Sequence, residues 1–325
     1  MPASTVYSIL LKKENAHDDP IYCCSWVSYN TQGDSKNAAV DFIATGGLDG
    51  LVKVWTLKDG RLELIHTLEG HTLAVVSVVF SPDIQIIASS SLDSTLILWD
   101  LNSGKKYKEI QTGATDVWKV AFSPEGEQVA TGGHSGRVFI YNVVNGTLDK
   151  VLDTRGKFTM SVSWSPDGKY IATGSTDGIV CIMDVAQGKL LHTIEAHSQP
   201  IRSVAFSPKS KHLATASNDG HVKVYDVDSA SLTNKLDHKC WVLNVCFSSD
   251  GTRVATAAAD GSVRVALLDG LTVLNTFKEH TDIVWGVQFN GTGTKLLSVS
   301  KDKCMNVYEC PLPPKLEKKQ AYIVV

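Results

Sequence analysis

Three residue types that can together perform nucleophilic catalysis recur along this chain: a histidine, a hydroxyl residue and an aspartate. The first set is His17, Thr45 and Asp49, and the equivalent hydroxyl and aspartate positions follow at intervals of 41 to 44 residues. In a hydrolase the histidine would take the proton of the hydroxyl nucleophile while the aspartate orients the imidazole. An enzyme needs one such set, whereas this chain repeats it. We therefore expect a structural hydrogen-bond network and no catalysis.

The repeated positions are located by their distance from an aromatic residue that ends one strand in every unit. Nine residues before that aromatic stand His17, His71, Gly113, Arg155, His197, His238 and His280. The hydroxyl position holds Thr45, Ser89, Thr131, Thr173, Thr215, Thr256 and Ser298. A further position, mostly aromatic, holds Trp55, Trp99, Tyr141, Met183, Tyr225, Ala266 and Tyr308. Units three and four lack the histidine and unit six lacks the aromatic, so we expect these units to rely on apolar packing and to be locally softer.

Other motifs that carry chemistry are missing from the sequence. Its seven cysteines include no Cys-x-x-Cys pair and no set with zinc-site spacing, and no phosphate-binding loop or nucleophile elbow occurs. We therefore expect no metal, no cofactor and no enzymatic activity. Cys246 and several other cysteines fall within apolar strand patterns, which is typical of small buried residues in a reducing compartment.

Charge and hydropathy exclude further classes. The net charge is −3 at pH 7, and no basic stripe alternates with aromatics, so we expect no direct binding to nucleic acid. No apolar stretch approaches the roughly 18 residues of a membrane-spanning helix. Residues 1–13 lack the basic start of a signal peptide. We expect an intracellular protein, in the nucleus, the cytoplasm or both, without a membrane partner.

An internal repeat supplies the elements that position these residues. The turn position of Asp49 recurs at residues 93, 135, 177, 219, 260 and 302. Each unit contains a strand ending in an aromatic, a turn, a second strand, a turn that is often Asp-Gly, and a third strand of alternating polarity. Most units add a fourth strand. Seven such units of about 42 residues predict an all-β fold, a seven-bladed propeller with four-stranded blades.

The two ends of the chain predict how the ring closes. Fourth strands follow units one to six, but the seventh unit continues into a proline-rich segment. Residues 6–11 form a spare strand pattern at the N-terminus, which we predict to complete the last blade. The propeller should span residues 1–310, and residues 311–325 should form a flexible C-terminal tail.

With these features in place, the chain resembles the WD-repeat family, whose blades carry a His–Ser/Thr–Asp–Trp hydrogen-bond network. The resemblance runs from residue 6 to about residue 310 and involves all seven units. It implies a WD40 β-propeller that acts as a protein-interaction scaffold.

Comparing the seven units with one another separates packing positions from variable positions. Two and five residues before the first-strand aromatic, the side chains are small and mostly β-branched, so we expect these to be core positions. Four and six residues before it, the side chain changes from unit to unit, although a repeated packing register would not require this. The resemblance places both variable positions at the mouth of the central channel.

Large aromatics and arginine at those positions are typical of binding hot spots. We predict that the channel mouth binds a protein partner through Tyr22, Val76, Trp118, Phe158, Met160, Arg202, Trp241, Leu243 and Trp285. The residues just before the turn position should rim the same face; they include Leu48, Leu92, His134, Asn218 and Lys301.

Some stretches go beyond the general WD pattern, among them residues 152–158, 241–245 and 284–291. In these stretches the chain is similar to the WD-repeat subunits of superkiller complexes. That resemblance implies as partners the TPR-repeat scaffold and the helicase of the superkiller complex, which serves exosome-linked mRNA decay in the cytoplasm. It also implies subunits of the Paf complex, which supports transcription elongation in the nucleus.

Two other functions stay open. A WD40 adaptor that reads histone tails could use Trp118 and Trp285 at the channel mouth. A substrate receptor of a ubiquitin ligase would often carry a Trp-Asp-x-Arg motif, but here Trp99-Asp100 is followed by Leu101 and Asn102. The second alternative is therefore the weaker one.

Overall fold

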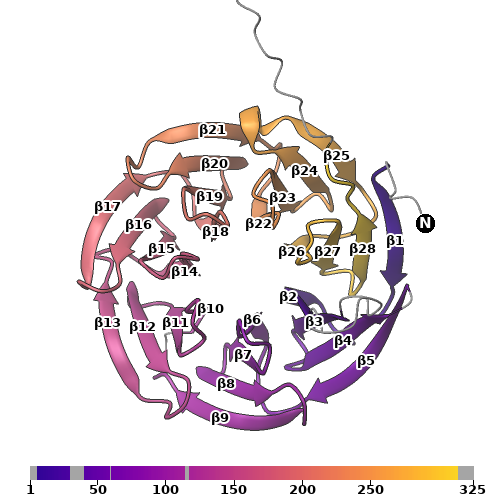
Figure 1. Ribbon diagram of the computed structural model, residues 1–325, viewed down its shortest axis with the longest axis horizontal. Coiled ribbons are helices and arrows are strands. Elements are labelled where there is room, and N and C mark those ends of the chain that lie inside the picture. Colours follow the sequence, from indigo (N-terminus) through magenta and orange to yellow (C-terminus); the bar gives the residue numbers. More distant parts are fainter. Residues whose placement is uncertain (1–5, 30–39, 59, 114–116, 314–325) are drawn as a thin grey trace, which may run out of the picture.

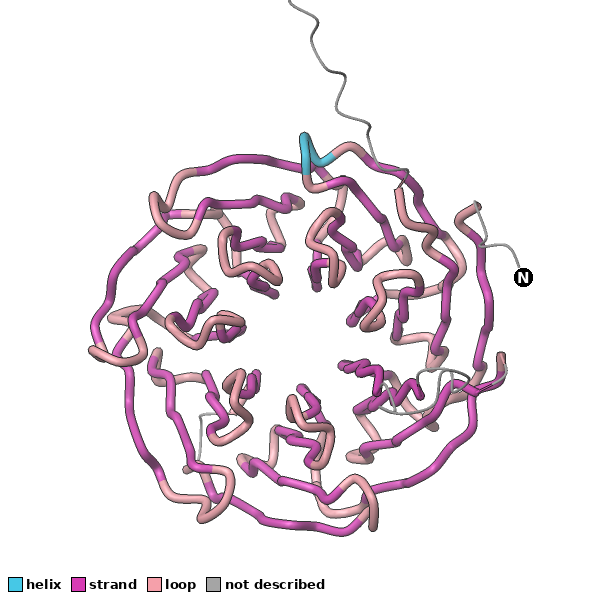
Figure 2. The backbone as a smooth tube through the Cα atoms, in the orientation of Figure 1, coloured by secondary structure: helices cyan, strands magenta, loops and turns pink. Residues whose placement is uncertain are grey.

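The strand patterns of the sequence fold into a ring of small sheets. The computed structural model describes residues 6–29, 40–58, 60–113 and 117–313, which form seven four-stranded antiparallel sheets set as blades around a central axis (Figure 1). The predicted all-β, seven-bladed propeller is therefore confirmed. The one helix of the described residues is the 3₁₀ turn η1 (Asp269–Leu271), which lies at the outer rim (Figure 2).

Each blade runs outward from the axis. The innermost strands are β2 (Ile21–Tyr29), β6 (Val75–Phe80), β10 (Lys119–Phe122), β14 (Thr159–Trp164), β18 (Ile201–Phe206), β22 (Val242–Phe247) and β26 (Val284–Phe289). The second strands are β3 (Val40–Gly47), β7 (Ile86–Ser91), β11 (Gln128–Gly132), β15 (Tyr170–Ser175), β19 (His212–Ser217), β23 (Arg253–Ala258) and β27 (Lys295–Ser300).

The outer half of each blade consists of a third and a fourth strand. The third strands are β4 (Val52–Lys58), β8 (Thr95–Asp100), β12 (Arg137–Asn142), β16 (Ile179–Asp184), β20 (His221–Asp226), β24 (Val263–Leu267) and β28 (Met305–Glu309). The outermost strands are β5 (Arg61–Leu68), β9 (Lys105–Gln111), β13 (Leu148–Asp153), β17 (Lys189–Glu195), β21 (Leu232–Asp237), β25 (Val273–Phe277) and β1 (Ser8–Lys13).

The N-terminal strand closes the ring, as predicted. Strand β1 pairs antiparallel with β28, so the last blade has the order β1-β28-β27-β26 (Figure 1). The strand begins at Ser8 and ends at Lys13, two residues later than the predicted segment. Just beyond it, the Ala16 N–H donates to the Lys303 carbonyl at 2.9 Å, which extends the junction. The last blade thus combines a strand from the start of the chain with three strands of residues 284–309, and β1 leads directly into the first blade. The predicted tail lies mostly outside the described residues, which end at 313.

The hydrophobic core is divided among the spaces between neighbouring blades. In one cluster Ala44 and Val54 of the first blade pack with Val75 and Val78 of the second, all nearly inaccessible to solvent. The positions five residues before the first-strand aromatic are buried in every blade, and so are those two residues before it, apart from the half-buried Cys24. Burial between blades thus accounts for the constancy of these positions.

The repeated polar residues form a network that ties the turns to the strands. In the first blade, His17 Nδ1 lies 2.9 Å from Asp49 Oδ2, and His17 Nε2 lies 2.8 Å from Thr45 Oγ1. Trp55 Nε1 donates to the same hydroxyl at 3.0 Å. Thr45 is fully buried and engaged by both neighbours. Its hydroxyl therefore serves packing, because a nucleophile has to be reached by a substrate.

The network varies between blades. The second blade has all four members in contact, and the seventh uses the Tyr308 hydroxyl, 3.1 Å from Ser298 Oγ, in place of an indole. In the fifth blade the Tyr225 hydroxyl donates to the Ala196 carbonyl instead. In the histidine-free fourth blade, Asp177 accepts a hydrogen bond from Ser175 of its own turn. The expectation that the incomplete blades are softer stays a prediction.

Candidate binding site at the channel mouth

Two kinds of segment meet at one end of the channel. The innermost strands begin there, and the turns between second and third strands reach the same rim. Backbone hydrogen bonds join the two: Leu48 N–H donates to the Pro20 carbonyl at 2.9 Å, and Leu92 N–H donates to the Ala74 carbonyl at 3.1 Å. Residues that start an inner strand and residues that precede a turn are therefore held on a common rim.

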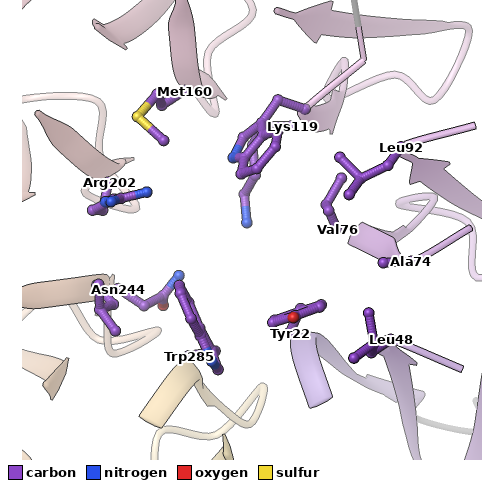
Figure 3. A pocket seen from close by; sticks show the side chains of 12 residues that line it. Tyr22, Leu48, Ala74, Val76, Leu92, Lys119, Met160, Arg202, Asn244 and Trp285 are labelled. Atoms are coloured by element: carbon purple, nitrogen blue, oxygen red, sulfur yellow. The ribbon is translucent and has the colours of Figure 1, made fainter. Parts of the chain in front are cut away.

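That rim encloses a cavity of about 250 Å³ at the end of the channel. Every blade contributes to its lining, which consists of Tyr22, Leu48, Ala74, Val76, Leu92, Trp118, Lys119, Met160, Arg202, Leu243, Asn244 and Trp285. The labelled side chains converge on a common opening from all sides (Figure 3). The lining is mainly apolar, with two cations and one amide.

Two pairs of aromatic rings stiffen the walls of this cavity. The rings of Tyr22 and Trp285 meet edge to face, with centroids 5.4 Å apart and an interplanar angle of 84°. Trp118 meets Phe158 in the same way, at 5.5 Å and 88°. Edge-to-face contacts hold large rings in place before a ligand arrives, so little side-chain freedom is lost on binding.

The polar handle of the cavity is Arg202 of β18. Its Nε donates to Asn218 Oδ1 at 3.0 Å, and Asn218 N–H in turn donates to the Pro200 carbonyl. Burial lowers the pKa of the Arg202 guanidinium from its ordinary value, yet an arginine remains charged near neutral pH. The site thus holds a positioned, partly desolvated cation.

The structure brings seven of the nine predicted site residues into this one cavity; they are Tyr22, Val76, Trp118, Met160, Arg202, Leu243 and Trp285. Met160 and Leu243 are nearly buried and form its walls, while the other five are half-buried. Phe158 does not line the cavity but packs between the Trp118 ring and the His134 ring. The role of the nine predicted residues in binding stays a prediction.

Contrary to the prediction, Trp241 does not line the channel-mouth cavity, and its role in binding stays a prediction. It directly precedes β22 and lies 52% exposed beside a separate hollow formed with Asp219, His238 and Cys240. Ala74 holds the equivalent position of the second blade and does line the cavity. Just before an inner strand, the position in the repeat therefore does not by itself decide which hollow a side chain enters.

The predicted rim residues divide into two groups. Leu48 and Leu92 line the cavity. Asn218 holds Arg202, His134 packs on Phe158, and Lys301 pairs with Asp282, with Nζ 3.3 Å from Oδ2. The last three therefore contact neighbouring side chains of the same face instead of the cavity.

Three residues line the cavity that were not among the predicted site residues: Ala74, Lys119 and Asn244. The signal was present for two of them. Three residues before the first-strand aromatic stand Cys23, Ser77, Lys119, Ser161, Ser203, Asn244 and Gly286, which are small except in the third and sixth blades. The comparison of units that singled out two other variable positions would have found this third one as well.

Comparison with known proteins agrees with this architecture. The family model described as the IFT122 first beta-propeller matches residues 59–309, and the model described as the WD domain, G-beta repeat matches residues 8–56. Together with the seven four-stranded blades and their His–Thr–Asp–Trp network, these matches show that the chain belongs to the WD-repeat β-propeller family. Propellers of this family generally act as protein-interaction scaffolds without catalysis.

Curated relatives match over shorter segments. The chain is 35% identical over 113 residues to WD repeat-containing protein SL1-17 of Schistosoma mansoni, which is 35% of this chain and 36% of that protein. It is 35% identical over 105 residues to WD repeat-containing protein VIP3 of Arabidopsis thaliana, which is 32% of this chain and 30% of that protein. The matched segments thus span about a third of these relatives' length.

The described residues contain neither a candidate membrane span nor a candidate metal cluster. No helix in this part of the chain is long and apolar enough to cross a bilayer. Across the same described ranges, no group of three or more histidine, cysteine, aspartate or glutamate side chains is arranged to hold a metal ion.

Proposed function

We propose that the protein is a non-catalytic scaffold that holds a segment of a partner protein at the channel mouth. The observation that supports this is the cavity itself, which Tyr22, Trp118, Trp285 and Arg202 line from four different blades. Aromatics and arginine in a pre-ordered hollow are the composition of interface hot spots. The seven-fold packing does not require these four side chains, because the equivalent positions of the other three blades hold Val76, Met160 and Leu243.

The partners that we propose are the TPR-repeat scaffold and the helicase of the superkiller complex, and subunits of the Paf complex. The support is the similarity of residues 152–158, 241–245 and 284–291 to superkiller WD-repeat subunits. Two of these stretches contribute Leu243 and Trp285 to the cavity. The proposed locations are the cytoplasm for exosome-linked mRNA decay and the nucleus for transcription elongation.

Replacing Trp118 and Trp285 with alanine tests the site. We expect the double variant to lose binding to the TPR-repeat subunit by at least about thirtyfold in a pull-down titration, because two hot-spot residues are removed. Trp241→Ala is the matched control, since it removes an exposed indole from the same face but outside the cavity. Equal binding by a folded double variant and by the control would contradict the site.

The proposed locations have a separate test. Affinity purification of the tagged chain from nuclear and from cytoplasmic extracts, followed by mass spectrometry, should recover Paf subunits from the first and superkiller subunits from the second. Recovery of ubiquitin-ligase adaptors or nucleosomes in place of both would contradict the proposed assemblies.

A further inference from the structure

We propose that the channel mouth recognises an apolar peptide segment that carries an acidic side chain, whose carboxylate binds the Lys119 ammonium. The inference deepens the proposed function and rests on it. It assigns the chemistry of the partner segment, which is an aspartate or glutamate near one or more apolar residues.

Lys119 occupies a position that links neighbouring blades elsewhere in the ring. In three blades the equivalent residue is a serine whose Oγ accepts a hydrogen bond from the inner strand of the next blade. These bonds are Val120 N–H to Ser77 at 3.3 Å, Val204 N–H to Ser161 at 2.9 Å and Val245 N–H to Ser203 at 3.3 Å. Asn244 makes the same bond through Oδ1, from Val287 N–H at 3.4 Å. A lysine side chain has no acceptor, so Lys119 cannot make this link between blades.

Lys119 has no ion-pair or hydrogen-bond partner among the described residues. Within those residues, no ion pair or hydrogen bond engages its ammonium group, and no carboxylate lines the cavity. The side chain extends toward the centre of the opening, surrounded by the labelled apolar residues (Figure 3). A half-buried cation above an apolar floor gains most from an anion that arrives with a ligand, because both charges then meet in a partly desolvated site.

The charges that line the cavity are complementary to an acidic partner segment. Arg202 is the second cation of the cavity, and within the described chain its hydrogen bond to Asn218 leaves it without a carboxylate partner. Among the described residues, the lining therefore carries two positive charges and no negative charge. A partner segment with a carboxylate is attracted to it, whereas a basic segment is repelled.

The lining of the cavity favours a peptide carboxylate over a free anion or a phosphate. Tyr22, Val76, Trp118, Leu92 and Trp285 give the cavity mainly apolar walls, which a small inorganic anion would not use. Forked phosphate recognition uses a freely oriented arginine. Here Asn218 holds the Nε of the single arginine, and the one lysine matches the single charge of an aspartate or glutamate.

The experiment selects short random peptides displayed on phage, in parallel on the wild-type chain and on the variants Lys119→Met and Lys119→Glu. Methionine keeps the length and apolar stem of lysine without its charge. We expect aspartate and glutamate to be enriched beside apolar residues in the wild-type selection. The enrichment should disappear with Lys119→Met and turn into lysine and arginine with Lys119→Glu.

A selected peptide is then synthesised with glutamate, glutamine or phosphoserine at the acidic position, and its affinity is measured by fluorescence anisotropy. The glutamine form should bind the wild-type chain about tenfold more weakly, and Lys119→Met should bind both forms equally. Binding of the phosphoserine form alone would overturn the assignment of a carboxylate.

The remaining outcomes separate this inference from the proposed function. Peptides that lose binding to the Trp118→Ala/Trp285→Ala variant but show no acidic preference would overturn the role of Lys119 and leave the channel-mouth site intact. Peptides whose binding ignores both tryptophan changes would contradict the site itself, and the inference with it.

Discussion

At the scale of single residues, His238 differs from the other blade histidines. His17, His71, His197 and His280 each place Nδ1 within 2.8 to 3.1 Å of an aspartate oxygen. His238 touches Thr256 Oγ1 at 3.2 Å, but within the described chain its buried Nδ1 has no partner. The aspartate of that blade, Asp260, accepts hydrogen bonds from Ser262 instead. Burial, aided by the charge of Arg264, lowers the pKa of His238 to about 4.

This lowered pKa predicts a loss of stability in mild acid. The unfolded chain binds a proton at His238 near pH 6.5, whereas the folded chain resists it until about pH 4. His238 therefore leaves the free energy of unfolding unchanged above pH 6.5. As the pH falls from 6.5 to 4, this residue lowers the free energy of unfolding by about 3 kcal/mol at most. Urea unfolding across this range gives the free energy of unfolding as a function of pH. The pH dependence should have a shallower slope for His238→Gln than for the wild type.

Other groups also respond to acid. Hydrogen bonds from their histidines and neighbours lower the pKa values of Asp49, Asp93, Asp219 and Asp302, so those groups destabilise the fold only as the pH falls below about 4. Burial also lowers the pKa values of His71 and His197, which act in wild type and variant alike, so the difference between the two proteins reports His238. His134→Gln is the control, because His134 is exposed and should leave the slope unchanged. A slope that His238→Gln does not alter would refute the assignment.

At the scale of elements, the turns between second and third strands depend on glycine where the next loop passes close. Gly178 has φ of +81°, and a Cβ atom there would collide with the carbonyl oxygen of His197. That contact exists because His197 N–H donates to the Gly178 carbonyl at 2.9 Å, which ties the turn to the loop. The turn and the histidine loop therefore form one unit.

Gly178→Ala should accordingly cost more than strain alone. Left-handed backbone costs an alanine about 1–2 kcal/mol, and the collision should raise the total to about 3 kcal/mol. Gly60→Ala is the matched control, since Gly60 has φ of +73° with no atom within 4 Å of a Cβ, so it should cost only the strain. Equal unfolding free energies for the two variants in urea would show that the turn has room to move.

The same scale explains what the sequence could and could not predict. Blade number, strand order and the closing role of β1 follow from a repeat that fixes which residues pack, as the buried Val75 and Val284 show. Trp285 lies inside β26, where the strand fixes its direction, and it lines the cavity as expected. Just outside the strands the repeat does not decide the direction: Trp118 directly precedes β10 and lines the cavity, whereas Trp241 directly precedes β22 and lies beside a separate hollow.

At the scale of the whole molecule, the ring is also held together where the sixth blade meets the seventh. Arg253 of β23, in the sixth blade, is fully buried and reaches into the seventh. Its Nη1 donates to the carbonyls of Cys310 and Pro311, both at 3.1 Å, and its Nη2 donates to the Gly293 carbonyl at 2.7 Å. The guanidinium also lies 5.4 Å from the centre of the Phe289 ring. One side chain thus holds the end of the last blade against its neighbour.

Arg253→Met should therefore weaken the closed ring. Methionine fills much of the same volume but leaves three carbonyl groups without their donor, so we expect a loss of about 3 kcal/mol in the free energy of unfolding. Arg264→Met is the control, because Arg264 donates to a single carbonyl, that of Asp237, at 3.2 Å in a more exposed setting. It should cost less than about 1 kcal/mol. Similar urea midpoints for the two variants would mean that ring closure depends on the β1–β28 pairing alone, without support from the sixth blade.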